Sequence, residues 1–166
     1  MKLPKAAPES DRMQIRPFQA KDLPPYESWF ADPVLDAQLG PMDRVWMEQG
    51  LVDPDRALYS ILRGEELVAV VGINLPSPAH PYYFVTDLAV RPPLRGSGIG
   101  RAVMGLVMNR RELQGSPLWR ASVRPDNPGA LAFLLKLGWT RLEMGNPFDE
   151  LLEFEFHRRP AGPGFR

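Results

Sequence analysis

Glycines and arginines between residues 95 and 101 form the stretch of this sequence with the clearest chemical use. Glycine stands at the alternate positions 96, 98 and 100. A backbone without Cβ atoms can approach another molecule closely, and the first amides of a helix lack intrahelical partners, which favours an anion there. The pattern predicts an anion site; the alternative is a turn that only joins a strand to a helix. The residues predicted to form the site are Arg95, Gly96, Ser97, Gly98, Ile99, Gly100 and Arg101.

Two common phosphate-binding motifs do not fit the same residues. The GxxxxGK[ST] loop requires a lysine and a hydroxyl after its last glycine, whereas Arg101 and Ala102 follow Gly100. The dinucleotide fingerprint GxGxxG requires glycine at position 101 or 103, where the chain has arginine and valine. Nucleotide binding through either motif is therefore excluded.

The segment L-x-V at residues 88–90, followed by Arg95-x-x-Gly98-x-Gly100, resembles the pyrophosphate loop of the GNAT acetyltransferases. The resemblance implies that residues 95–101 hold the pyrophosphate of acetyl-CoA, the co-substrate of that family. It also implies that backbone amides of the preceding strand polarise the acetyl carbonyl, at Leu88, Ala89 and Val90.

A second stretch, from Asn127 to Trp139, resembles the N-x-x-A helix of the same family, which ends in a glycine and an aromatic residue. The resemblance implies that Asn127 caps the helix and reaches the coenzyme, that Ala130 leaves space for it, and that Phe133 contacts it. Many relatives place a tyrosine seven residues after the asparagine as the acid for the leaving thiolate, but this chain has Leu134. Either another group supplies the proton, the thiolate leaves unaided, or the protein is impaired in transfer.

The family's reaction is direct attack of an amine on the acetyl thioester within a ternary complex, so a base that deprotonates the amine is implied. Asp87 is the leading candidate, because it comes just before the coenzyme-contacting residues of the central strand. The alternative is a carboxylate that pairs with a neighbour. Tyr83 is a second catalytic candidate, and Tyr82 and His80 stand near the entrance of the same strand.

The acceptor site is predicted in the helical region after the first strand, where aromatic residues stand beside carboxylates and suit a cationic amine. The predicted contacts are Trp29, Phe30, Asp32 and Trp46. The segment W-x-x-D-P with a following L-G resembles aminoglycoside 6'-acetyltransferases and ribosomal-protein N-terminal acetyltransferases. The alternative is that Trp29 and Phe30 pack the helix on the sheet.

The elements that position these residues follow from periodicity and turn signals. Strands are predicted at 13–18, 57–63, 67–75, 82–90, 118–123, 140–144 and 151–157. Helices are predicted from about residue 23, with Asp22 as the cap and an interruption at Asp32-Pro33, and at 42–49, 99–109 and 127–137. This order predicts one α/β (α+β) domain of GNAT type. Its twisted, mixed but mostly antiparallel sheet has about seven strands, flanked by about four helices.

Length and composition set the remaining limits. The 166 residues fit one domain, which we place at 13–158, between flexible tails at 1–12 and 159–166. Twenty basic and twenty acidic residues give no electrostatic reason to expect a nucleic acid or a membrane surface. The chain has no cysteine and two histidines, so no metal is predicted and no enzyme thioester can form.

The predicted function is therefore acetyl transfer from acetyl-CoA to a primary amine, with a small cationic amine as acceptor. Two alternatives stay open, a protein N-terminal acetyltransferase and a coenzyme-A-binding domain without turnover. No signal peptide and no apolar run of about 20 residues is present, which predicts a cytoplasmic protein. The family resemblance also allows a homodimer.

Overall fold

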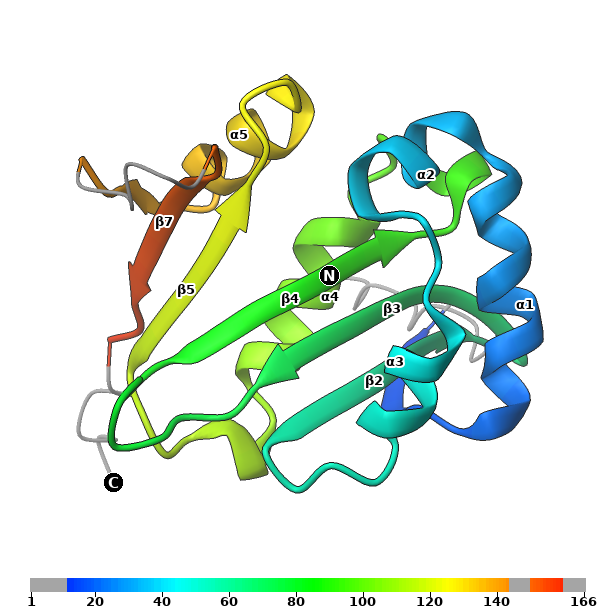
Figure 1. The fold of residues 1–166 in the computed structure, drawn as a ribbon, viewed down its shortest axis with the longest axis horizontal. Helices are drawn as coiled ribbons and strands as arrows, with labels where there is room; N and C mark the ends of the chain where they lie inside the picture. The colour runs from blue at the N-terminus through cyan, green and yellow to red at the C-terminus, as the bar shows by residue number, and fades with distance from the viewer. Residues whose placement is uncertain (1–11, 144–149, 160–166) are drawn as a thin grey trace, which may run out of the picture.

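Strand β4 (Tyr83–Val90) lies inside a seven-stranded sheet with the order β1-β2-β3-β4-β5-β7-β6 (Figure 1). The computed structural model describes residues 12–143 and 150–159. Neighbouring strands are antiparallel except β4 and β5, which are parallel. The other strands are β1 (Met13–Pro17), β2 (Arg56–Arg63), β3 (Glu66–Asn74), β5 (Leu118–Val123), β6 (Thr140–Arg141) and β7 (Leu152–His157).

Strands β2 and β3 form an antiparallel hairpin within the sheet. Gly64 adopts a positive φ of 62° in the turn, a conformation that favours glycine. Residues 67–73 of β3 are all buried, and their run of mostly β-branched side chains is typical of a strand covered on both faces.

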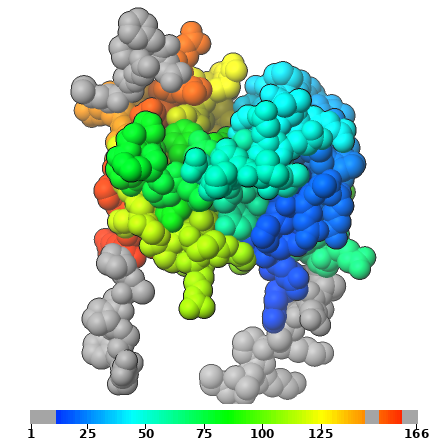
Figure 2. All heavy atoms as spheres, turned by 60° about the horizontal axis from the view of Figure 1, so that its bottom comes forward, coloured from blue at the N-terminus to red at the C-terminus, as the bar shows by residue number. Residues whose placement is uncertain are grey.

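Helices cover the sheet on both sides. On one side lie α1 (Leu23–Ser28), α2 (Pro33–Leu39) and α3 (Arg44–Gly50), and on the other lie α4 (Ile99–Met108) and α5 (Pro128–Lys136). Figure 2 shows α2 and α3 in cyan as an outer layer of the molecule. No helix in the described part of the chain is both long and apolar enough to cross a membrane.

Two apolar cores hold these layers together. The larger core lies under α4 and α5 and includes Ile61, Val103 and Trp119, which are fully buried. The smaller core lies under α1–α3 and joins Tyr26 and Met47 to the opposite face of the sheet. Side chains of β3 therefore pack into both cores, which fixes the sheet between two helical layers.

The predicted fold class and all seven strands are confirmed, within a few residues at the ends. Five α-helices replace the four expected, because Pro33 begins α2 as a separate helix after a short 3-10 turn at Trp29–Ala31. Strand β6 ends at Arg141, and the predicted residue 144 lies outside the described residues. Residues 1–11 and 160–166, most of the two predicted tails, also lie outside them.

The prediction that Asp22 caps α1 is wrong in its mechanism. Asp22 stands at the N-cap position, but its side chain makes no capping hydrogen bond to α1. Its carboxylate accepts bonds from the Arg16 guanidinium at 2.6 and 2.9 Å, from the Gln19 backbone N–H at 2.9 Å and from the Ser60 hydroxyl at 2.7 Å. Burial raises the pKa of Asp22, but these hydrogen bonds and the charge of Arg16 outweigh it, so the pKa lies below its ordinary value of 3.8.

Asp22→Asn is expected to lower the free energy of unfolding at neutral pH by about 3 kcal/mol, because a buried, paired charge is lost. Since the pKa of Asp22 is depressed in the folded state, its contribution is present above the unfolded-state pKa and disappears as the pH falls through the folded value. Urea unfolding from pH 7 to pH 2.5 measures the difference. Asp126→Asn, which changes an exposed carboxylate paired with Arg124, is the control and should cost under about 1 kcal/mol. A difference between wild type and Asp22→Asn that stays constant with pH would contradict this account.

Candidate functional site

Strands β4 and β5 separate after a short region of pairing. Their register joins Tyr83 to Trp119, Phe84 to Arg120 and Val85 to Ala121, and it ends there although β4 continues to residue 90. Figure 1 shows the carboxyl ends of the two strands pointing apart. Within the described residues, positions 87–90 pair with β3 alone. Their second edge therefore presents backbone groups to whatever lies between the two strands.

A β-bulge in β4 lies where this separation begins. Gly72 of β3 faces Asp87, and the next residue, Ile73, faces Val85, so Thr86 is the inserted residue. Beyond the bulge, the predicted coenzyme contacts Leu88, Ala89 and Val90 are paired with residues 71, 70 and 69 of β3. The bulge changes the faces of the sheet to which the side chains of residues 86 and 87 point, at the position where β4 and β5 separate.

The glycine turn begins α4 in a conformation that only its glycines adopt easily. Gly96 and Gly98 have φ values of 75° and 82°, and a Cβ built on either would meet no atom within 4 Å. The space over this backbone is therefore open. The first bond of the helix runs from the Ala102 N–H to the Gly98 carbonyl. The amides of residues 99–101 have no hydrogen-bond partner in the described part of the chain.

The side chain of Ser97 and the lack of one at Gly100 determine the shape of the turn. The Ser97 hydroxyl donates to the Leu94 carbonyl across the turn. A Cβ on Gly100 would stand 3.2 Å from the ring of Phe133, so this glycine lets α4 approach α5. The Ile99 side chain is buried in the core, which leaves its backbone amide for contact with a ligand.

Helix α5 carries the second predicted motif. The side-chain oxygen Oδ1 of Asn127 accepts a hydrogen bond from the Ala130 N–H at 3.1 Å, which confirms the predicted cap. Ala130 and Phe133 are half-buried against the larger core. Leu134, at the position where relatives have tyrosine, is 7% exposed and packs in that core. No hydroxyl is therefore available at this position.

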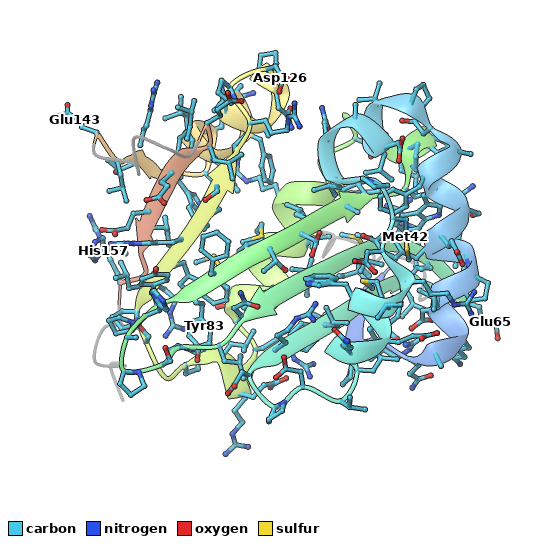
Figure 3. All side chains as sticks on the ribbon, in the orientation of Figure 1. Met42, Glu65, Tyr83, Asp126, Glu143 and His157 are labelled. Carbon is cyan, nitrogen blue, oxygen red and sulfur yellow. The ribbon has the colours of Figure 1, made fainter. Side chains whose placement is uncertain are left out.

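Tyr83 lies on the buried side of β4. It is 3% exposed, its ring stacks on Trp119 with centroids 4.6 Å apart, and its hydroxyl accepts a hydrogen bond from the Gly115 N–H at 3.0 Å. Figure 3 shows it near the start of β4, before the bulge at Thr86. This environment gives Tyr83 a packing role, and we assign it no part in catalysis.

Asp87 lies on the opposite face, toward α1–α3, where the absence of a side chain on Gly72 makes room for it. A Cβ on Gly72 would come within 2.6 Å of Thr86 Oγ1 and 3.0 Å of Asp87 Oδ2. Thr86 Oγ1 donates to Asp87 Oδ2 at 2.9 Å. Burial raises the pKa of Asp87 above 3.8, while the bond from Thr86 and the charge of Arg56 act against the rise. Such a desolvated carboxyl at a strand bulge is a candidate acid–base group.

Arg56, which the sequence analysis did not select, lies near Asp87. Its guanidinium carbon sits 3.6 Å over the Trp46 ring, and its Nη1 donates to the Trp46 carbonyl at 3.2 Å. Gly50 provides the space, since a Cβ there would stand 3.0 Å from Arg56 Nη2. Trp46, a predicted acceptor contact, therefore holds an arginine. A lone arginine at the start of a strand gives no sequence signal for this arrangement.

The aromatic residues of α1 and the following turn pack together. Tyr26 meets Trp29 and Phe30 edge-to-face, with ring centroids 5.5 and 5.2 Å apart. Trp29 is 7% exposed and belongs to the smaller core, which agrees with the packing alternative, whereas Phe30 is half-buried. Burial and the charge of Asp87 both raise the pKa of Tyr26. The Tyr26 hydroxyl makes no hydrogen bond to any described residue. It is a further polar group on the face of the sheet where Asp87 lies.

The last two predicted residues are joined to each other. Arg95, from the predicted coenzyme site, donates from Nη2 to Oδ1 of Asp32, from the predicted acceptor site, at 2.6 Å. The same oxygen accepts bonds from the Val34 and Leu35 amides and so caps α2. Asp32 therefore lies beside the start of the glycine turn, in contact with Arg95.

Charged side chains also cross the paired end of β4, β5 and β7. Arg120 Nε donates to Glu155 at 2.9 Å, and the same carboxylate lies 2.7 Å from His157. The Arg120 guanidinium sits 4.4 Å from the centroid of the Tyr82 ring, and the Tyr82 hydroxyl lies 3.2 Å from His80 Nδ1. Figure 3 labels His157 at the outer edge of this row. In the described residues, no three His, Asp or Glu side chains come together in a way that could hold a metal ion.

The separated strands, the bulge and the open glycine turn are the features of an acetyltransferase fold, and comparison with known families agrees. Residues 18–139 match the family described as "Acetyltransferase (GNAT) family". The chain belongs to the GNAT acetyltransferase family, whose members are acyltransferases. No curated protein sequence matches the chain significantly.

Solved structures share the fold over nearly the whole chain. An acetyltransferase from Thermus thermophilus is 27% identical, with a TM-score of 0.72 over 87% of this chain and 96% of that one. The ribosomal-protein-S18-alanine N-acetyltransferase of Escherichia coli is 15% identical, with a TM-score of 0.69 over 93% and 99%. The spermidine N-acetyltransferase of Vibrio cholerae, in complex with CoA and spermine, is 10% identical, with a TM-score of 0.73 over 88% and 95%. At the last two identities the likeness concerns the fold alone.

Gly72→Ala is expected to lower the free energy of unfolding by about 1–3 kcal/mol, because the new Cβ would overlap Thr86 and press on Asp87. Thermal unfolding monitored by circular dichroism measures the effect. Gly105→Ala in α4 is the matched control: its Cβ would meet nothing within 4 Å, so it should stabilise the protein by about 0.5–1 kcal/mol. Equal stability of the two variants would show that Gly72 does not make room for Asp87.

Proposed function

We propose that this protein transfers an acetyl group from acetyl-CoA to a primary amine within a ternary complex. The observation that carries the proposal is the opening between β4 and β5, which leads to a glycine turn with free space above its backbone. A thin coenzyme arm fits between separating strands, and an anionic pyrophosphate fits the amides that begin a helix. The residues present therefore suit acetyl-CoA.

The proposed contacts come mainly from the backbone. The amides of residues 96–101 would hold the pyrophosphate, and the free edge of β4 at residues 88–90 would bind the coenzyme arm and polarise the acetyl carbonyl. Asn127, Ala130 and Phe133 of α5 would line the other side. When bound, acetyl-CoA supplies the activated acyl group as a thioester.

Asp87 is the proposed base. Its Oδ2 accepts the Thr86 hydroxyl, while its Oδ1 makes no hydrogen bond to a described residue and can take a proton from the amine, directly or through water. Arg56 favours the ionised form of the carboxyl, and burial opposes it. The combination holds a base of raised pKa close to the strand edge, where the acceptor would approach.

The proposal assigns no protein acid to the leaving group, because Leu134 offers no hydroxyl. Three tyrosine hydroxyls are engaged, that of Tyr59 with Glu112, that of Tyr82 with His80 and that of Tyr83 with the Gly115 amide. The hydroxyl of Tyr26 makes no hydrogen bond to a described residue, but burial and the charge of Asp87 raise its pKa, and we assign it no role. A thiol ionises near pH 8.5, so a thiolate is a fair leaving group without protonation.

The proposed acceptor is a small cationic amine. Among the relatives in fold, one acts on spermidine and one on a ribosomal-protein alanine, so an amine acceptor agrees with both. A protein N-terminal amine is the alternative, and it is favoured by the arrangement in Figure 1, where α1–α3 lie over β2–β4 and leave β5 and β7 uncovered on that side. A coenzyme-A-binding domain without turnover is the other alternative, kept open by Leu134.

Calorimetric titration with acetyl-CoA, and in parallel with ATP and NAD, tests the proposal. Micromolar binding of acetyl-CoA alone would support it, and a subsequent screen of polyamines, aminoglycosides and peptide amines would separate the acceptor classes. Absence of acetyl-CoA binding would refute the coenzyme role of the glycine turn. A location in the cytoplasm and a homodimer stay predictions, which cell fractionation and light scattering can check.

Gly98→Asp is expected to weaken acetyl-CoA binding at least about tenfold relative to Gly98→Asn, because a carboxylate at the start of α4 repels the pyrophosphate. The asparagine variant is the control, since both side chains must adopt the same φ of 82° and both tolerate it better than most residues. Calorimetry with each variant measures the dissociation constants. Equal affinities would place the phosphates elsewhere.

Asp87→Asn is expected to lower kcat about a hundredfold or more with little change in acetyl-CoA affinity. Because a base works in its ionised form, the wild-type rate should fall as the pH drops through the raised pKa of Asp87, and this acidic limb should be missing in the variant. Asn removes a desolvated charge, so thermal stability should be equal or higher. Asp53→Asn, which also removes a carboxylate near Arg56, is the control for charge alone. Turnover unaffected by Asp87→Asn would rule out this base.

A further inference from the structure

The ion pair between Arg95 and Asp32 connects segments 63 residues apart in the sequence. Arg95 opens the glycine turn, and Asp32 ends the 3-10 turn that follows α1. Both side chains are about one-third exposed, at 34% and 30%. Exposed ion pairs seldom contribute much to stability. The Arg95–Asp32 pair is therefore more informative for its position at the predicted phosphate site than for its effect on folding.

Both partners are fixed by other bonds. The Arg95 N–H donates to the Pro92 carbonyl at 3.2 Å, which anchors the backbone just before Gly96. Asp32 Oδ1 accepts from the Val34 and Leu35 amides at 3.1 and 2.9 Å as the N-cap of α2. The carboxylate is thus held by the helix, and it can hold the guanidinium in turn.

The guanidinium retains donors for another partner. Arginine has five N–H groups, and in the described residues the Arg95 side chain uses one nitrogen, Nη2, toward Asp32. A guanidinium oriented by a carboxylate loses less side-chain entropy when it binds a phosphate oxygen. The negative charge of Asp32 has the opposite effect, because it repels the phosphates directly. These two effects predict opposite results when the charge is removed.

We propose that Asp32 is a positioning residue of the coenzyme site, which acts by holding Arg95 beside the glycine turn, and not a contact of the acceptor. This assignment rests on the proposed coenzyme role of the turn. It differs from the role predicted from the sequence, where the Trp29-Phe30-Ala31-Asp32 segment placed Asp32 with the acceptor. Asp32 stays paired with Arg95 while the remaining guanidinium donors face the phosphates.

Calorimetric titration with coenzyme A tests this on wild type, Asp32→Asn, Arg95→Gln and the double variant. Asparagine is as good an N-cap as aspartate, so Asp32→Asn removes the charge and leaves α2 capped. The expected result is a threefold to fivefold increase in Kd, about the size of an exposed charge pair. Asp43→Asn is the matched control, because Asp43 caps α3 through the Trp46 amide at 2.9 Å and pairs with no arginine in the described residues. It should leave the Kd unchanged.

The double variant and steady-state kinetics separate positioning from a general structural effect. In the Arg95→Gln background, Asp32→Asn should cause no further loss, since the residue to be positioned is gone. The KM for acetyl-CoA should rise, with kcat and the acceptor KM unchanged. Tighter or unchanged coenzyme binding by Asp32→Asn, an equal loss in both backgrounds, or a rise in the acceptor KM alone would overturn the assignment. If wild type itself binds no coenzyme A, the proposed function fails along with it.

Discussion

The early separation of β4 from β5 is the constraint on which the rest of the site depends. A parallel pair of strands normally gains hydrogen bonds along its length, but here the register covers three residue pairs and then stops. From Asp87 to Val90, the β4 backbone pairs with β3 on one side and has no partner on the other among the residues that the structure describes. The proposed coenzyme site uses that free edge for the arm of acetyl-CoA, and the edge leads directly into the turn at the start of α4, which is proposed to bind the pyrophosphate.

Glycines determine how closely groups approach at this site, and they do so for different reasons. Gly98 provides a backbone conformation and open space, whereas Gly100, Gly72 and Gly50 remove a Cβ that would collide with Phe133, Asp87 or Arg56. The glycines of the second kind allow the half-buried carboxyl of Asp87 and the half-buried guanidinium of Arg56 to lie near each other. Charged groups cost stability when they are desolvated, so their position beside a bulged strand agrees with the acid–base role proposed for Asp87.

The fold and the glycine turn could be predicted from the sequence, because they depend on local signals. Alternating apolar residues specify the strands, and the spacing of Gly96, Gly98 and Gly100 specifies a turn before a helix. What the sequence could not provide was the pairing of distant residues. Asp32 and Arg95 were assigned to different sites, and Arg56 was not selected. Tyr83 and Asp87 were both catalytic candidates, but they lie on opposite faces of β4, because the bulge at Thr86 changes the alternation of side chains. Asp22 looked like a helix cap, whereas Ser60, far away in the sequence, helps to bind it.

The row of side chains from Tyr82 through Arg120 and Glu155 to His157 lies at the end where β4 and β5 still pair. It ties together two half-sheets, one of β1–β4 and one of β5, β7 and β6. In the described residues, backbone hydrogen bonds join the two half-sheets at this end alone. A given change in the angle between the half-sheets would therefore displace the glycine turn and α5, at the separated end, further than it would displace Tyr82 or Arg120.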